Sequence, residues 1–330
     1  MKRLLITILM SIVLLGCINQ ENEIENRDEF PQEPMKGVSL SPRSFESEDF
    51  TRFFEIAQQA GKIISWAGDW NELTMENGGP RVVTELASVY DYVPLVIVQF
   101  FTQSTGKLIR PLSAENREKY TMSALSFVKT YHPQYFALGI EVNVLYEKSP
   151  QDFEDFVTFY SEVYDAIKKE SPITKVFTIF QLERMKGLHG GLFGGENDPD
   201  NEQWTLLDKF PKVDIAAFTT YPGLIYKNPS DIPADYYTEI SLYTRKPVAF
   251  TEIGWHSTAA IPGWESSEYE QREFVEIFFT LTKNMNIELM IWSFLYDQGI
   301  SEPFWSMGFY DKDGNAKPAW DAWIKGTEIN

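Results

Sequence analysis

The sequence predicts a single (β/α)8 barrel, an α/β fold in which eight parallel strands are each followed by helical or loop segments. From Met35 onward, apolar strand-like runs alternate with amphipathic stretches. Eight such units in roughly 290 residues fit the size range of this barrel. Two of the runs also end on a carboxylate, as expected where barrel strands carry chemistry at their carboxyl ends. An open doubly wound sheet is the alternative, disfavoured because no glycine-rich phosphate turn follows the first strand.

The predicted strands are short and apolar on both faces, which is typical of a parallel sheet covered by helices. In chain order they span residues 36–40, 62–66, 95–100, 135–141, 175–181, 213–221, 248–252 and 289–295. Helical periodicity marks residues 44–60, 114–131, 151–170, 267–283 and 318–325. No short-period repeat and no second domain interrupt this pattern, so residues 35–330 are predicted to form one domain.

The first 34 residues have a different character. Residues 1–16 have a basic start and an apolar run too short for a comfortable transmembrane helix, as in a signal peptide. The run ends in Leu-Leu-Gly-Cys, which resembles the lipobox of prokaryotic lipoproteins, and this resemblance implies that Cys17 becomes the lipidated N-terminus. The alternative is an ordinary signal or anchor with a coincidental cysteine. Residues 17–34 are acidic and polar, and are expected to form a disordered tether.

The lipobox resemblance places the protein outside the cytoplasm, anchored in the cell membrane by lipid alone. Cys17 is the only cysteine, so no intramolecular disulfide is possible. The net charge of −19 argues against nucleic acid and against an anionic membrane surface as partners. A neutral substrate fits this charge, although solubility alone also explains it. We expect a monomer that needs no cofactor.

Side chains at the predicted strand ends suit a sugar. Aromatic rings can stack on the C–H face of a sugar, and amide and carboxylate groups can bind its hydroxyls. Because only one of the three histidines lies among these ends, a histidine-based metal site is not expected. The candidate residues in chain order are Arg43, Trp66, Asp69, Glu141, Asn143, Gln181, Tyr221, Glu252, Trp255, His256 and Trp292.

The fourth and seventh predicted strands end on Glu141 and Glu252, and these two strand ends face each other across a barrel mouth. A retaining glycosidase needs such a pair, one carboxylate as nucleophile and one carboxylic acid as proton donor, about 5–5.5 Å apart. The negative charge of Glu252 should raise the pKa of Glu141. Each glutamate alone could be a strand-end surface residue, and Glu183 after the fifth strand is a rival carboxylate.

Three segments carry a family resemblance. FTEIGWHS at 250–257 and GIEVN at 139–143 resemble the strand-seven and strand-four glutamate motifs of the retaining (β/α)8 glycosidases called clan A. FTEIGWHS looks most like the strand-seven motif of the endo-β-mannanase-like and endo-β-galactanase-like families of that clan. The ending GFYDKDGNAKPAWDAW resembles the close of many such barrels. The resemblance implies that Glu141 is the acid/base, Glu252 the nucleophile and Tyr221 its hydrogen-bond partner. It also implies that Trp292 is the floor under the sugar.

One position departs from this pattern. Many clan members have an asparagine directly before the acid/base, where it binds the substrate 2-hydroxyl, and this chain has Ile140. Asn143, two residues beyond Glu141, is not in the equivalent position. The departure weakens the galactanase comparison and favours the mannanase-like one, whose members can lack the asparagine.

Less specific interpretations of these residues stay open. Tyr221 could cap its strand before Pro222, Trp292 could belong to the core, and His256 could be a loop residue near the site. The function predicted from the sequence is hydrolysis of β-glycosidic bonds in a polysaccharide or oligosaccharide by double displacement. The alternatives are a non-catalytic carbohydrate-binding barrel at the cell surface and a transglycosidase with the same residues.

Overall fold

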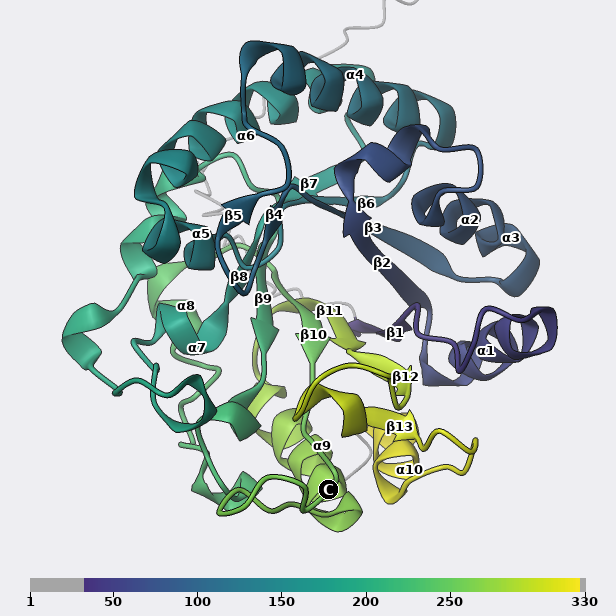
Figure 1. Cartoon of the computed structure of the whole chain (residues 1–330), viewed down its shortest axis with the longest axis vertical. Coiled ribbons are helices and arrows are strands. Elements are labelled where there is room, and N and C mark those ends of the chain that lie inside the picture. The colour runs from purple at the N-terminus through teal and green to yellow at the C-terminus, as the bar shows by residue number, and fades with distance from the viewer. Residues whose placement is uncertain (1–32, 327–330) are drawn as a thin grey trace, which may run out of the picture. The chain divides into compact units, whose positions relative to one another are not determined.

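A computed structural model describes residues 33–326 and confirms the α/β barrel. Figure 1 shows the strands at the centre with helices around them. The main sheet is parallel and has the order β7-β6-β3-β2-β1-β11-β10-β9-β8. Segments β7 and β8 are two halves of the fifth barrel strand, interrupted at Thr178; β7 pairs with β6 and β8 pairs with β9. Counted in this way, eight strand positions run around a nearly closed barrel.

The barrel strands are β1 Met35–Ser39, β2 Ile63–Asp69, β3 Val93–Gln99, β6 Tyr135–Leu138, β7 Lys175–Phe177, β8 Ile179–Gln181, β9 Ala216–Thr220, β10 Val248–Ile253 and β11 Ile287–Trp292. Two small pairs lie outside the main sheet, β4 Phe101–Thr102 with β5 Lys107–Leu108, and β12 Phe294–Tyr296 with β13 Gly308–Tyr310. The helices are α1 Ser47–Ala60, α2 Gly79–Glu85, α3 Ala87–Tyr90, α4 Ala114–Tyr131, α5 Val142–Lys148, α6 Pro150–Glu170, α7 Leu182–Met185, α8 Ile240–Tyr243, α9 Glu268–Thr282 and α10 Pro318–Lys325.

All five predicted helices are present, with ends within three residues of the prediction. The strands differ more. The fourth strand stops at Leu138, three residues before Glu141, and the eighth is divided at Ser293 into β11 and β12. The second strand extends to Asp69. Short helices in the βα connections, such as α2 and α5, were not predicted because four to seven residues give little periodicity.

The core is rich in aromatic side chains where the helices cover the barrel. Every residue of β6 and β9 is buried, as the two-sided apolar pattern requires. On α9, Phe274 and Phe278 are fully buried, and Phe278 contacts the ring of Phe250 on β10 edge to face. Burying one such ring stabilises the fold by about 1.5–3 kcal/mol. This packing fixes the strands, and therefore fixes the side chains at their carboxyl ends.

Three predicted features of the N-terminus lie outside the described residues. They are the signal peptide, Cys17 and nearly all of the tether. Between residues 33 and 326, no helix combines the length and the apolar character needed to cross a membrane.

Candidate functional site

Glu252 lies near the end of β10, between the fully buried Thr251 and Ile253. The register of β10 against β9 shifts between Phe250 and Glu252, so simple alternation does not predict which way this side chain points. The Tyr221 hydroxyl donates to Glu252 Oε2 over 2.5 Å, so the predicted contact is present. Ser293 Oγ in turn donates to the Tyr221 oxygen over 3.0 Å, which leaves the tyrosine proton for the carboxylate.

Glu141 lies in a sharp bend beyond β6. Gly139 and Glu141 have φ values of +83° and +54°, in the left-handed region that a glutamate rarely occupies. A Cβ on Gly139 would come within 2.8–3.2 Å of Val142, Phe100 and Phe156, so packing also requires glycine there. Glu141 is held in this unusual backbone conformation at a strand end, a feature that is enriched at functional sites.

The Glu141 carboxyl is buried, with 8% of the residue exposed. Thr219 Oγ1 at the end of β9 donates to Glu141 Oε1 over 2.8 Å. Gln181 Nε2 at the end of β8 donates to the same oxygen over 3.3 Å. Neighbouring strand ends therefore fix the position of this carboxyl, and Gln181 lies where the sequence predicted a site residue.

Burial and mutual charge set the protonation of the two carboxyls. Burial first and the negative charge of Glu252 second raise the pKa of Glu141, and the Thr219 hydrogen bond opposes them; together they bring this pKa to about 8. Burial also raises the pKa of Glu252, but the Tyr221 hydroxyl opposes this rise by stabilising the carboxylate. The predicted rise at Glu141 is confirmed. In such a coupled pair, Glu141 is the group that keeps the proton near neutral pH.

Glu252 opens onto a cavity of about 470 Å³. Its walls come from segments at the carboxyl ends of the first, second, seventh and eighth strands. They combine apolar rings with hydroxyl and carboxylate groups. The lining residues are Ser39, Leu40, Phe45, Phe50, Ser65, Trp66, Ala67, Glu72, Asn77, Gly79, Val82, Glu252, Ser293 and Phe294. Of the residues predicted from the sequence, Trp66 and Glu252 line this cavity.

The structure corrects three aromatic predictions, because the side chains are buried away from this cavity. Trp292 is fully buried, stacks on Phe309 with ring centroids 4.5 Å apart, and donates to the Met307 carbonyl. It packs in the core and does not form a floor under a sugar. Trp255 is also fully buried and stacks on Phe274. His256 is 1% exposed, contacts the Trp264 carbonyl, and has a pKa lowered by burial.

Three polar predictions also lie outside the cavity. Asn143 is fully buried and connects α5 with the end of β8: its Oδ1 accepts from the Gln181 amide over 2.8 Å. Asp69 forms an ion pair with Arg110. Arg43 pairs with Asp49 and lines a different surface cavity beside α1. These three side chains serve mainly structural contacts.

Several cavity and support residues were not predicted. Phe294 is the aromatic residue beyond β11 that does face the cavity, two positions after Trp292. Glu72 enters from the short helix Trp70–Thr74, for which no strand-end rule applies.

The rival carboxylate Glu183 is fully buried and accepts from the Tyr221 amide and the Tyr236 hydroxyl, each over 2.8 Å. It supports the Tyr221 backbone and does not line the cavity.

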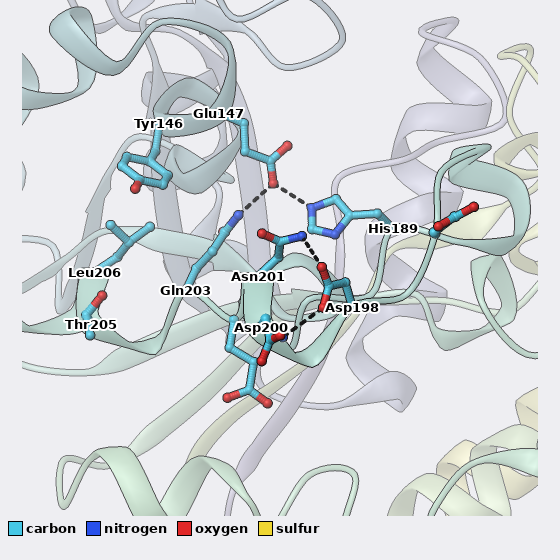
Figure 2. A pocket seen from close by; sticks show the side chains of 11 residues that line it. Tyr146, Glu147, His189, Asp198, Asp200, Asn201, Gln203, Thr205 and Leu206 are labelled. Carbon is cyan, nitrogen blue, oxygen red and sulfur yellow. Dashed lines mark hydrogen bonds and ion pairs between the residues drawn. The ribbon is translucent and has the colours of Figure 1, made fainter.

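A second cavity of about 550 Å³ lies beside the loop after β8 (Figure 2). Glu147 Oε1 there contacts His189 Nε2 at 2.8 Å and accepts from Gln203 Nε2 over 2.7 Å. Arg184 pairs with Glu147 and donates through Nε to Gln181 Oε1 over 2.6 Å. Since Gln181 also contacts Glu141, a continuous set of hydrogen bonds connects this cavity with the buried carboxyl.

Comparison with known proteins places the fold among glycoside hydrolases. No family model and no curated protein sequence matches the chain. A family 39 glycoside hydrolase from Bacteroides cellulosilyticus WH2 superposes with a TM-score of 0.61 at 18% identity, over 89% of this chain and 64% of that one. GH5_18 from Streptomyces cattleya, in complex with GlcNAc, gives 0.63 at 14% identity, over 90% and 80%.

A β-glucuronidase from Bifidobacterium dentium, complexed with coumarin-3-O-glucuronide, gives a TM-score of 0.59 at 14% identity. The match covers 89% of this chain but 46% of that protein, so this chain spans less than half of its length. Identities this low establish a shared architecture. The chain therefore has the barrel fold that these glycoside hydrolases use.

Proposed function

We propose that the protein is a retaining β-glycosidase with Glu252 as nucleophile and Glu141 as acid/base. The observation that carries the proposal is the contrast between two coupled carboxyls. Burial and the Glu252 charge raise the pKa of Glu141 to about 8, whereas a tyrosine hydroxyl stabilises ionised Glu252. Burial raises the pKa of both carboxyls, but the Tyr221 hydroxyl opposes the rise at Glu252, and acid-assisted glycoside cleavage requires one carboxyl that keeps its proton beside one that loses it.

In the first step, a Glu252 oxygen bonds to the anomeric carbon as the glycosidic C–O bond breaks, and Glu141 gives its proton to the leaving oxygen. In the second step, Glu141 takes a proton from water, and that water displaces Glu252 from the anomeric carbon. Loss of the Glu252 charge in the intermediate removes one cause of the raised Glu141 pKa. Glu141 then ionises more readily and suits its role as base.

The test is product stereochemistry together with a nucleophile variant. NMR of the first-formed product from a β-glycoside should show the β-anomer. Glu252→Gln should abolish turnover while its circular dichroism stays that of the wild type. First-formed α-anomer, or hydrolysis by the purified Glu252→Gln protein, contradicts the assignment.

One observation favours a non-catalytic carbohydrate-binding barrel as the second candidate. Ile140 has an aliphatic side chain, which cannot form a hydrogen bond with a substrate 2-hydroxyl. The residue is 2% exposed, and its backbone amide already donates to Gln99 Oε1. A crystal structure distinguishes the candidates, since a retaining pair needs carboxyls about 5–5.5 Å apart. A much larger separation, with sugar binding but no cleavage across mannans, galactans and glucans, favours the binding protein. Product analysis with an acceptor sugar identifies transglycosylation.

We also propose that the barrel is held at the outer side of a cell membrane by lipid on Cys17, and acts there as a monomer. The support is the position of the only cysteine directly after Leu-Leu-Gly. Cys17→Ser should move the protein from the membrane fraction to the soluble fraction without changing the activity of the barrel. Unchanged membrane association contradicts the lipid anchor.

A further inference from the structure

Trp66 occupies a fixed position in the wall of the Glu252 cavity. Its indole lies against two glycines: a Cβ on Gly79 would be 2.0 Å from the indole Nε1, and one on Gly68 would be 2.3 Å from the ring. Neither glycine has a positive φ, so it is space for the indole, not backbone conformation, that requires glycine at both positions. With 8% of the residue exposed, only part of the indole borders the cavity, and this part is held rigidly in place for contact with a ligand.

Glu72 lies beside this ring. Its Oε1 would be 3.0 Å from a Cβ on Gly68, and its Oε2 accepts only a long, 3.5 Å hydrogen bond from the Gly79 amide. Much of the hydrogen-bonding capacity of this carboxylate is therefore free for another donor. We call Trp66, Gly68, Glu72 and Gly79 the Trp66–Glu72 corner.

The charge of the cavity has one sign. Among the described residues that line it, Glu72 and Glu252 are the ionisable side chains, and no lysine, arginine or histidine is present. The remaining polar side-chain groups are the hydroxyls of Ser39, Ser65 and Ser293, the amide of Asn77 and the indole N–H of Trp66. A ligand carboxylate would meet negative charge without a basic partner, whereas sugar hydroxyls or an ammonium group can donate to Glu72.

We infer that the Trp66–Glu72 corner binds a sugar unit that carries no carboxylate and donates hydrogen bonds to Glu72. The inference rests on the proposed function and deepens it by naming the substrate class: neutral or amino-sugar β-glycosides, with uronides excluded. Trp66 supplies rigid apolar contact and Glu72 is the specificity-determining residue.

The test uses the full chain and a panel of aryl β-glycosides with one leaving group, comprising glucoside, galactoside, mannoside, glucosaminide, glucuronide and galacturonide. The best non-anionic substrate should exceed both uronides by about 100-fold in kcat/KM. Glu72→Gln should reduce kcat/KM on that substrate by about ten-fold, mainly by raising KM. The ratio of kcat/KM on that substrate to kcat/KM on the uronides should also decrease. Glu76→Gln, an exposed change four residues along, is the matched control.

Preference for a uronide, or equal behaviour of Glu72→Gln and Glu76→Gln, overturns the inference while the glycosidase function stands. If no glycoside is cleaved, the proposed function fails and calorimetric titration with the parent sugars decides the inference. Tighter binding of glucose, mannose, galactose or glucosamine oligosaccharides than of uronate oligosaccharides, weakened by Glu72→Gln, supports it. Tighter binding of uronates, or no binding of any sugar, overturns it.

Discussion

The two carboxyls of the site occupy different surroundings. Glu252 lines an open cavity, and its direct hydrogen-bond partner is the Tyr221 hydroxyl. Glu141 is almost entirely buried, accepts from two side chains, and is connected through Gln181 to Arg184. An attacking carboxylate must reach a sugar carbon, and a proton donor must resist ionisation. The difference in surroundings therefore supplies a physical basis for the difference in proposed roles.

The largest expected effect tests this contrast through the leaving group. Glu252→Gln should reduce kcat/KM by about 10⁴-fold or more on every glycoside, because every substrate needs the nucleophile. Glu141→Gln should cause a comparable loss on alkyl glycosides and oligosaccharides. With a 2,4-dinitrophenyl leaving group, which departs without a proton, Glu141→Gln should retain most of the rate of the first step.

The measurement is steady-state and pre-steady-state kinetics on both substrate types, with circular dichroism as the control for folding. Equal losses for Glu141→Gln on the two types would remove the acid role from Glu141. A leaving-group dependence in Glu252→Gln instead would reverse the two assignments.

The next effect concerns Tyr221, whose hydroxyl donates a hydrogen bond to Glu252. Tyr221→Phe removes the hydroxyl that opposes the burial-induced rise in the Glu252 pKa. The pKa of Glu252 should therefore rise, and the acid limb of the kcat/KM profile should move to higher pH. We expect a loss of about ten- to 100-fold at the optimum.

Tyr236→Phe is the control for Tyr221→Phe, since its hydroxyl contacts Glu183 and not Glu252. An acid limb that stays in place in Tyr221→Phe, or moves equally in Tyr236→Phe, would show that this hydrogen bond does not set the ionisation of Glu252.

Features of the barrel and of the site that depend on regular strand and helix patterns are predictable from the sequence. Apolar periodicity identified the barrel because strands and helices bury many residues in a regular pattern. Glu252 and Tyr221 were found because each closes or follows a clear strand. Trp292 was assigned to the wrong environment because strand-end position does not say whether a side chain points to the cavity or to the covering helices. The bend at Ser293 then brings Phe294 to the cavity.

Other parts of the site had no local signal. Glu72 reaches the cavity from a short helix and lies close to Gly68, which also contacts the Trp66 ring. The groups that act on the Glu141 pKa lie far along the chain: Thr219, which donates to the carboxyl, is 78 positions away, and Glu252 is farther still. Long-range packing of this kind is not encoded in the spacing of neighbouring residues.

A smaller effect is expected at the alkaline limb. With the pKa of Glu141 at about 8, kcat/KM should fall as pH rises through that value, because the acid loses its proton. Thr219→Val removes a hydrogen bond that lowers this pKa. The alkaline limb should then move upward by roughly half a pH unit to one unit.

Thr251→Val is the matched control for Thr219→Val, a buried threonine on the next strand whose hydroxyl contacts the Phe218 carbonyl. Its alkaline limb should stay in place. A limb that moves downward in Thr219→Val, or does not move, would contradict the assignment of that limb to Glu141.

The smallest expected effect is on stability. The Glu141 pKa is about 8 in the folded protein against an ordinary value of 4.5. Between these values the folded state holds a proton that the unfolded state has lost, so stability falls as pH rises through this window. Glu141→Gln removes the buried acid. Its Tm relative to wild type should therefore increase from pH 5 to pH 8.5, by about a few degrees.

Calorimetric scans of Glu141→Gln and of the exposed control Glu118→Gln test this expectation. The control should follow the wild type across the range. If the Tm of Glu141→Gln minus that of the wild type instead shrinks toward pH 8.5, Glu141 ionises easily in the folded protein. Burial of Glu141 would then no longer explain why its proposed role differs from that of Glu252. If this Tm difference grows toward pH 8.5, the burial that keeps Glu141 protonated also lowers the stability of the wild type. Function and stability oppose each other in this way at other sites too.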